Sequence, residues 1–147
     1  MDGFGGNTKA FFFEFSMPYD GQTGFNGDMP SLWMLNAQIP RTGQYSSCSC
    51  WQSGCGEFDI CEVLDSGNPR CKSTYHGNTP GGSSDYFQRP TASTMKMAVV
   101  MVDDQIHVQQ LDDSQDFGSS MSGSTISGIS SDSSAADLLS SIFKLGS

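Results

Sequence analysis

The chain contains, at residues 55–64, the segment Cys55-Gly56-Glu57-Phe58-Asp59-Ile60-Cys61-Glu62-Val63-Leu64, with three carboxylates in an otherwise apolar and small setting. Alternation along a β-strand puts Glu57 and Asp59 on one face and the apolar residues between and after them on the other. On a regular strand Glu62, which follows Glu57 by an odd number of residues, would lie on the apolar face. One extra residue, a β-bulge near Ile60-Cys61, would return Glu62 to the face of Glu57. The segment therefore predicts a bulged strand that carries all three acids on one surface.

Three acids on one surface suit the hydrolysis of a glycosidic bond. Retaining hydrolysis needs two carboxyl groups about 5–5.5 Å apart, one as nucleophile and one as acid/base. With the bulge counted out, Glu57 and Glu62 lie roughly 13 Å apart along the strand, and side chains that each lean inward by about 4 Å reach the required distance. Asp59 between them can hydrogen-bond to one glutamate and help keep the two carboxyl pKa values apart. The spacing alone leaves open the alternative of a solvated acidic face.

The motif Glu57-Phe58-Asp59-Ile60-Cys61-Glu62 resembles the bulged E-x-D-x-x-E signature of glycoside hydrolase family 16, as in laminarinases. Its surroundings resemble a fungal cell-wall group, the Tos1-type glycosyl hydrolases, from about residue 10 to residue 118. The resemblance implies that Glu57 is the nucleophile, that Asp59 assists it and that Glu62 is the acid/base. The other matching stretches are 32–41, 48–51, 54–57, 85–90 and 104–108.

Two tryptophans are candidates for sugar contact. Trp33 lies in the predicted strand 31–39, where it shares a face with Leu35 and is either a core residue or a platform for a pyranose ring. Trp51 lies in a Cys-rich loop just before the acidic strand, where core packing explains a tryptophan less well. We therefore expect a sugar contact at Trp51 and leave both interpretations open at Trp33.

Further substrate contacts are implied by the resemblance alone. Tyr75-His76-Gly77 matches an aromatic-His-Gly element of the resembling enzymes, so His76 is expected to bond to sugar hydroxyls or to the acids. A structural role for His76 is the alternative. Tyr86, Gln88 and Arg89 are candidates for the same kind of contact. The alternative is that Tyr86 and Phe87 pack and that Arg89 is a surface charge.

The composition restricts the partners of the chain. A length of 147 residues suits one domain, and the net charge of −9 argues against nucleic acid and anionic membranes, which both need a basic surface. A neutral β-glucan is compatible with this charge. No apolar stretch is long enough for a transmembrane helix. Oligomeric state is not determined by these features.

Five cysteines crowd into a short region, which is typical of disulfides and of a secreted protein. The start of the chain, Met1-Asp2-Gly3-Phe4-Gly5-Gly6, lacks the basic start and apolar run of a signal peptide. We therefore expect the chain to be the C-terminal part of a longer secreted precursor that resides in the cell wall. The five residues are Cys48, Cys50, Cys55, Cys61 and Cys71.

The cysteines also suggest pairings. Cys61 and Cys71 are expected to form a disulfide that closes a short loop after the acidic strand, and two of the other three could pair and leave the third for a partner upstream. A zinc site is disfavoured, because Cys48-Ser49-Cys50 and His76 match the usual ligand spacings poorly. No metal or cofactor is predicted; calcium at Asp112, Asp113 and Asp116 is a weaker alternative to a solvated acidic turn.

The remaining pattern predicts an all-β antiparallel sandwich of the jelly-roll, concanavalin-like type, with some N-terminal strands missing if the chain is a fragment. A central strand is expected at 9–17, a returning strand at 71–76 and a hairpin of 94–103 with 105–111. Residues 1–118 would form the sandwich, and residues 119–147 a Ser/Gly-rich segment ending in a short amphipathic helix at 135–145.

These features favour a secreted, retaining β-1,3-glucanase or a transglycosylase of the same mechanism. One alternative is a non-catalytic wall protein that binds β-glucan and keeps the sandwich and its acids. A second alternative is an assembly role, in which Phe-rich strands and an unpaired cysteine drive self-association.

Overall fold

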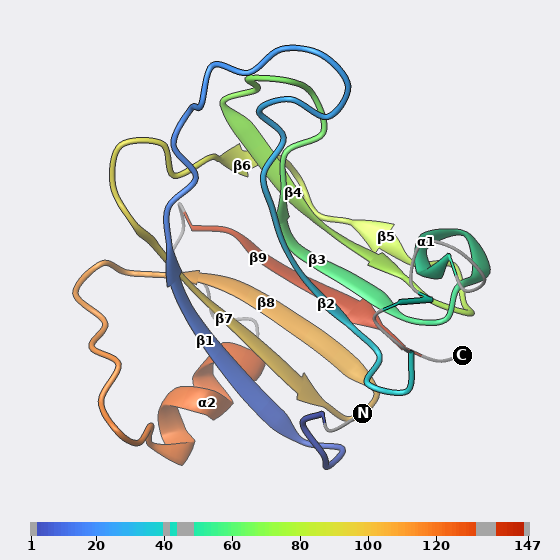
Figure 1. The fold of residues 1–147 in the computed structure, drawn as a ribbon. Coiled ribbons are helices and arrows are strands. Elements are labelled where there is room, and N and C mark those ends of the chain that lie inside the picture. Colours follow the sequence, from blue (N-terminus) through green and yellow to red (C-terminus); the bar gives the residue numbers. More distant parts are fainter. Residues whose placement is uncertain (1–2, 40–41, 44–48, 132–137, 146–147) are drawn as a thin grey trace.

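The structure, a computed structural model, describes residues 3–39, 42–43, 49–131 and 138–145. Its strands form two antiparallel sheets that pack face to face (Figure 1). The all-β sandwich predicted from the sequence is thus confirmed. Sheet 1 has the order β1 (Lys9–Phe15), β7 (Met95–Val102), β8 (Gln105–Leu111) and β9 (Ser140–Lys144). Sheet 2 has the order β2 (Ser31–Leu35), β3 (Glu57–Glu62), β4 (Arg70–His76) and β5 (Gly82–Ser83), and β6 (Phe87–Gln88) pairs with the first residues of β4.

The core lies between the two sheets and follows from alternation along their strands. Sheet 1 contributes Met97, Val99 and Val108, and sheet 2 contributes Phe58 and Ile60, all nearly or fully buried. Burial of these side chains removes their apolar surface from water at about 25 cal/mol per Å², which is the main force that holds the sheets together. The opposite face of each sheet points away from this core.

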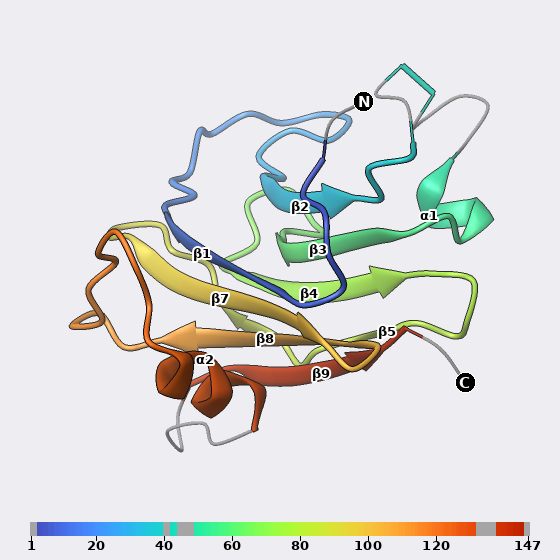
Figure 2. The same cartoon turned by 90° about the horizontal axis from the view of Figure 1, so that it is seen from below.

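The outer face of sheet 1 is covered by the short helix α2 (Gly123–Ser130), which lies against β7 and β8 (Figures 1 and 2). Ile126 and Ile129 of the helix pack on Ala98, Val100 and Leu111. The Ser122 hydroxyl accepts a hydrogen bond from the Thr125 N–H and caps the helix. A second short helix, α1 (Cys50–Ser53), precedes β3.

The end of the chain differs from the expectation. The helix predicted at 135–145 is wrong for the described part of that range, because residues 140–144 form β9 and pair with β8. The short helix of this region is α2, inside the Ser/Gly-rich segment. The division at residue 118 stays a prediction, although β9 beyond it belongs to sheet 1.

Two further expectations concern sheet 1. The strand expected to be central, 9–17, is β1, which pairs only with β7 among the described residues and so lies at the edge. The predicted hairpin is confirmed by β7 and β8, whose register runs from Lys96↔Leu111 to Val102↔Gln105. Its two turn residues have φ of 50° at Asp103 and 55° at Asp104, the left-handed conformation of a type I′ turn. Aspartate tolerates this conformation better than most residues.

No helix among the described residues is long and apolar enough to cross a membrane.

Candidate active site on the outer face of sheet 2

The bulge predicted in the acidic strand is present. Between the pairs Asp59↔Thr74 and Glu62↔Lys72, β3 advances by one residue more than β4 does. Against β2 the register shifts at the same place. Ile60 and Cys61 are consecutive, yet both are fully buried in the core between the sheets. The extra residue therefore changes the parity of the strand, as a β-bulge does.

This change of parity brings the three acids to one face. Residues paired directly across an antiparallel ladder point to the same side. Glu57 pairs with His76, and Glu62 pairs with Lys72, so both glutamates share the outer face of sheet 2 with Asp59. We call this surface, defined by Glu57, Asp59, Glu62, His76 and Trp33, the acidic face.

The acids at the centre of the acidic face are buried. Glu57 is 7% exposed and Asp59 is 3% exposed. Burial raises the pKa of Asp59 from an ordinary 3.8 to about 8, and the neighbouring Glu62 and Glu57 carboxylates add to the rise. A group with this pKa is protonated and neutral at pH 7, so Asp59 can donate a hydrogen bond to a carboxylate beside it.

The two glutamates respond to the same surroundings. Burial raises the pKa of Glu57 and of Glu62, and the His76 charge opposes the rise in both. His76 Nε2 lies 3.4 Å from Asp59 Oδ2, and one atom from each of Glu57, Asp59 and His76 lies within 4.8 Å of the others. The predicted contact between His76 and the acids is thus present. Carboxyl groups that lie close together and have raised pKa values are typical of acid/base sites.

The loop before β3 is fitted closely to the end of β4. Gly54 has φ of 69°, and a Cβ at this position would overlap the Gly77 carbonyl, immediately after His76. Asn36 N–H donates to the Gly56 carbonyl at 2.9 Å, which ties the end of β2 to the residue before Glu57. Glycine at residue 54 therefore allows the strand that carries Glu57 to begin beside the strand that carries His76.

Trp33 lies on the acidic face. It pairs with Asp59 across β2 and β3, while its neighbours Leu32 and Met34 pack against the core on the other side. The interpretation of Trp33 as a core residue between the sheets is therefore wrong, and its indole is half-buried next to the acids. Trp51 lies in α1, and its side chain is outside the described part of the chain.

Tyr86 also belongs to this side of the molecule. It is 48% exposed, and its ring lies 4.6 Å from Lys72 Nζ and 5.7 Å from the Arg70 guanidinium carbon. Lys72 shares the acidic face with Glu62 because the two pair directly. The acidic face is therefore bordered by Trp33 on β2 and by Tyr86 beyond β4.

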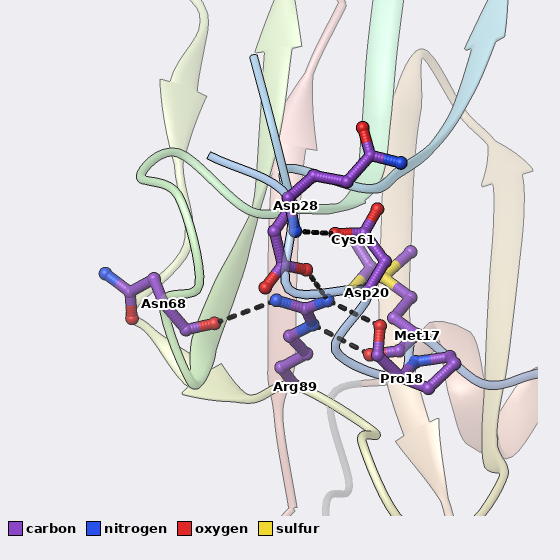
Figure 3. A network of polar contacts seen from close by, with 8 residues as sticks. Met17, Pro18, Asp20, Asp28, Cys61, Asn68 and Arg89 are labelled. Carbon is purple, nitrogen blue, oxygen red and sulfur yellow. Dashed lines mark hydrogen bonds and ion pairs between the residues drawn. The ribbon is translucent and has the colours of Figure 1, made fainter. Parts of the chain in front are cut away.

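Arg89 requires a correction. It is not a surface charge, because it is 1% exposed and its Nη2 lies 2.6 Å from Asp28 Oδ1. Arg89 Nε donates to the Met17 carbonyl at 2.7 Å, and Nη2 donates to the Pro18 carbonyl at 2.8 Å (Figure 3). These partners use the hydrogen-bond donors of the guanidinium and hold the segment after β1 in place. The placement of Arg89 therefore supports a structural role and not a sugar contact.

Ser73 supports the bulge, although its position in the sequence gives no sign of this role. The side chain is fully buried, and its hydroxyl donates to the Ile60 carbonyl at 2.6 Å. A bulge removes a backbone group from the regular ladder, and a buried carbonyl without a donor is costly. The Ser73 N–H in turn donates to Ser84 Oγ at 2.9 Å. Only the geometry of the folded strands identifies these partners.

Cys61 and Cys71 meet in the core behind the acids. Both are fully buried, and their sulfur atoms lie 2.7 Å apart. The contact with Cys71 and burial both raise the pKa of the Cys61 thiol. The pairing predicted from the sequence thus has the proximity that it needs. Cys48 lies outside the described residues, as does the side chain of Cys50, so pairings that involve them stay predictions.

The acidic turn after β8 stays a weak calcium candidate. The Asp112 carboxylate accepts hydrogen bonds from the N–H and the hydroxyl of Ser114, and these bonds lower the Asp112 pKa. An internally bonded aspartate of this kind is typical of a turn.

Comparison with known proteins identifies the family. Residues 1–129 match the family described as "Cell wall protein YJL171C/Tos1, C-terminal". The chain belongs to this family, whose members are described as cell wall proteins. No solved structure matches the chain.

Named relatives agree with this assignment. The chain is 48% identical over 136 residues to "Probable circularly permuted 1,3-beta-glucanase TOS1" of Candida albicans, covering 84% of the chain and 29% of that protein. It is 50% identical over 119 residues to the protein of the same name in Saccharomyces cerevisiae, covering 78% of the chain and 26% of that protein. The chain thus spans well under a third of the length of these relatives.

Proposed function

We propose that the acidic face is the catalytic centre of a secreted, wall-associated enzyme that cleaves β-1,3-glucan with retention of configuration. The observation that carries the proposal is the bulge in β3, which aligns Glu57, Asp59 and Glu62 on one face. The relatives named as probable 1,3-β-glucanases supply the substrate class. A transglycosylase would use the same first step and differ only in the acceptor.

In the proposed mechanism, Glu62 protonates the glycosidic oxygen while the Glu57 carboxylate attacks the anomeric carbon. The bond to the leaving sugar breaks, and a covalent glycosyl-enzyme forms at Glu57. Glu62, now ionised, takes a proton from water or from a sugar hydroxyl, and that oxygen displaces Glu57. The raised pKa of Glu62 suits its first role, because the acid must still hold its proton when substrate binds.

Asp59 and the aromatic residues have supporting roles in this proposal. A neutral Asp59 beside Glu57 donates a hydrogen bond to the nucleophile and keeps a third negative charge out of the site. The Tyr86 ring holds the Lys72 ammonium. Trp33 offers its ring face to a sugar beside the acids, and His76 bonds to sugar hydroxyls or to the acids. Trp51 remains a candidate for the same purpose.

The stereochemistry of the product tests the proposal. Digestion of laminarin followed by proton NMR should show the β-anomer first, before mutarotation mixes the two anomers. Glu57→Gln should lower turnover by at least about a thousandfold and leave glucan binding intact. Glu14→Gln is the matched control, because Glu14 is an exposed glutamate on β1 in the other sheet. Normal turnover by Glu57→Gln would overturn the assignment.

A second candidate is a non-catalytic module that binds β-glucan. The burial of Glu57 and Asp59 favours it, because carboxyl groups with so little exposed surface are poorly placed to reach an anomeric carbon. Binding of laminarin without release of shorter sugars, unchanged by Glu57→Gln, would support the binding module over the enzyme.

We also propose that Cys61 and Cys71 form a disulfide in the secreted protein. Oxidation would proceed by exchange with a disulfide of a donor protein, which takes up the two electrons and two protons that the thiols lose. The bond would join β3 and β4 directly behind the bulge and so fix the strand that carries Glu62.

A further inference from the structure

Lys72 pairs directly with Glu62 across β3 and β4, yet the two side chains form no ion pair in the described part of the chain. Residues paired across an antiparallel ladder have Cβ atoms about 4.5–5.5 Å apart, well within the reach of a lysine. Among the described residues, the close contacts between an acidic and a basic side chain join His76 to Asp59 and Arg89 to Asp28. The Lys72 ammonium instead lies 4.6 Å from the centre of the Tyr86 ring.

We propose that Tyr86 is a positioning residue that holds the Lys72 ammonium on its ring face and thereby keeps it away from Glu62. The inference rests on the proposed function, because the contact between Lys72 and Tyr86 has this purpose only if Glu62 is the acid of the reaction. An acid that must deliver a proton is weakened as a donor when a cation lies beside it and stabilises its ionised form. Tyr86 thus acts through Lys72 and needs no contact with the reacting atoms to do so.

The charged surroundings of Glu62 support this assignment. On β3 it has Glu57 and Asp59, on β4 it has Arg70, Lys72 and His76, and its partner on β2 is the uncharged Ser31. Burial raises the pKa of Glu62, and the His76 charge opposes the rise.

The Lys72 ammonium can be attracted to the Tyr86 ring or to the Glu62 carboxylate with similar strength. Arg70 follows the same side of β4 and approaches the ring within 5.7 Å, so two cations share one aromatic residue at a half-exposed site. The interaction energy of an ammonium with an aromatic face is comparable to its interaction energy with a half-exposed carboxylate. Removal of the ring should therefore let Lys72 turn to Glu62.

The pKa of Glu62 measured by carbon-detected NMR titration of the full chain tests the inference without any need for turnover. Tyr86→Leu, which keeps an apolar side chain and removes the π face, should lower the Glu62 pKa by about one unit. Tyr86→Phe, which keeps the ring, should leave it at the wild-type value. Lys72→Met in the Tyr86→Leu background should restore the wild-type value, and Lys72→Met alone should not change it.

Two outcomes would overturn the inference. In one, Tyr86→Leu leaves the Glu62 pKa unchanged; in the other, the pKa falls but Lys72→Met does not restore it, so that the fall has another cause. Neither outcome bears on whether Glu57 is a nucleophile. Conversely, a fully active Glu57→Gln would end the proposed function while the titration result stood.

Discussion

Arg89 and Asp28 form an ion pair inside the protein, with Nη2 of the arginine 2.6 Å from Oδ1 of the aspartate. They lie far apart in the sequence, and the arginine also holds the carbonyls of Met17 and Pro18 (Figure 3). The pair therefore fixes the path of the chain between β1 and β2, the strand that carries Trp33.

Arg89→Met should lower the free energy of unfolding by about 3–5 kcal/mol, because it leaves the Asp28 charge buried and the carbonyls of Met17, Pro18 and Asn68 without this donor. Urea unfolding measures the change. Lys144→Met, at an exposed position on β9, is the control and should stay within about 0.5 kcal/mol of wild type. A similar small change for Arg89→Met would contradict the structural role given to Arg89.

Ser73→Ala should lower the free energy of unfolding by about 1–3 kcal/mol, because the buried Ile60 carbonyl loses its donor. Ser83→Ala removes a hydroxyl from an exposed serine on β5 and should cost much less. If the two variants unfolded at the same urea concentration, the Ser73 hydroxyl would have no special role at the bulge.

Stability should fall as pH rises from about 4 to about 8, since the Asp59 pKa is higher in the folded chain than in the unfolded one. In this window the folded state binds more protons than the unfolded state, so raising the pH favours unfolding. The raised pKa values of Glu57 and Glu62 act in the same direction.

Asp59→Asn should flatten this dependence and make the protein more stable than wild type at pH 8, by about 1–3 kcal/mol. Urea unfolding at several pH values is the measurement. If wild type and Asp59→Asn showed the same dependence of stability on pH between pH 4 and pH 8, the raised pKa of Asp59 would be contradicted.

Cys61 and Cys71 should resist alkylation in denaturant until a reductant is added, if the protein is produced through an oxidising secretory route. Intact mass after alkylation measures this. Reductant should lower the stability of the wild type by about 2–3 kcal/mol, because the bond closes a short loop. The double variant Cys61→Ala/Cys71→Ala should not respond to reductant at that bond. Alkylation of both residues without reductant would rule out the disulfide.

The sequence was sufficient to predict the bulge in the acidic strand, because the spacing of the three acids does not fit a regular strand. Glu62 cannot join Glu57 on a regular strand, and a single extra residue at Ile60 and Cys61 resolves the conflict, as the structure confirms. By contrast, the partners of the bulge depend on strand pairing. Nothing in the local sequence around Ser73 indicates that its hydroxyl meets the Ile60 carbonyl.

The errors have equally specific causes. Leu139, Ile142 and Phe143 fit a helical period, but a short apolar run is ambiguous, and pairing with β8 made residues 140–144 a strand. β1 is rich in phenylalanine but lies at an edge, where its half-buried rings pack on both faces of sheet 1. Arg89 is buried because Asp28 and the Met17 carbonyl lie there, contacts that local sequence does not reveal.

In the part of the chain that the structure describes, helix α2 packs on the sandwich through Ile126 and Ile129, and its other residues are serine, glycine and threonine. Such an element opens at small cost compared with the paired strands on either side of it. A protease should therefore nick the chain first at α2, while β9 stays bound to β8. The nicked molecule should run as one particle under native conditions and as two fragments in denaturant, with the acidic face undisturbed.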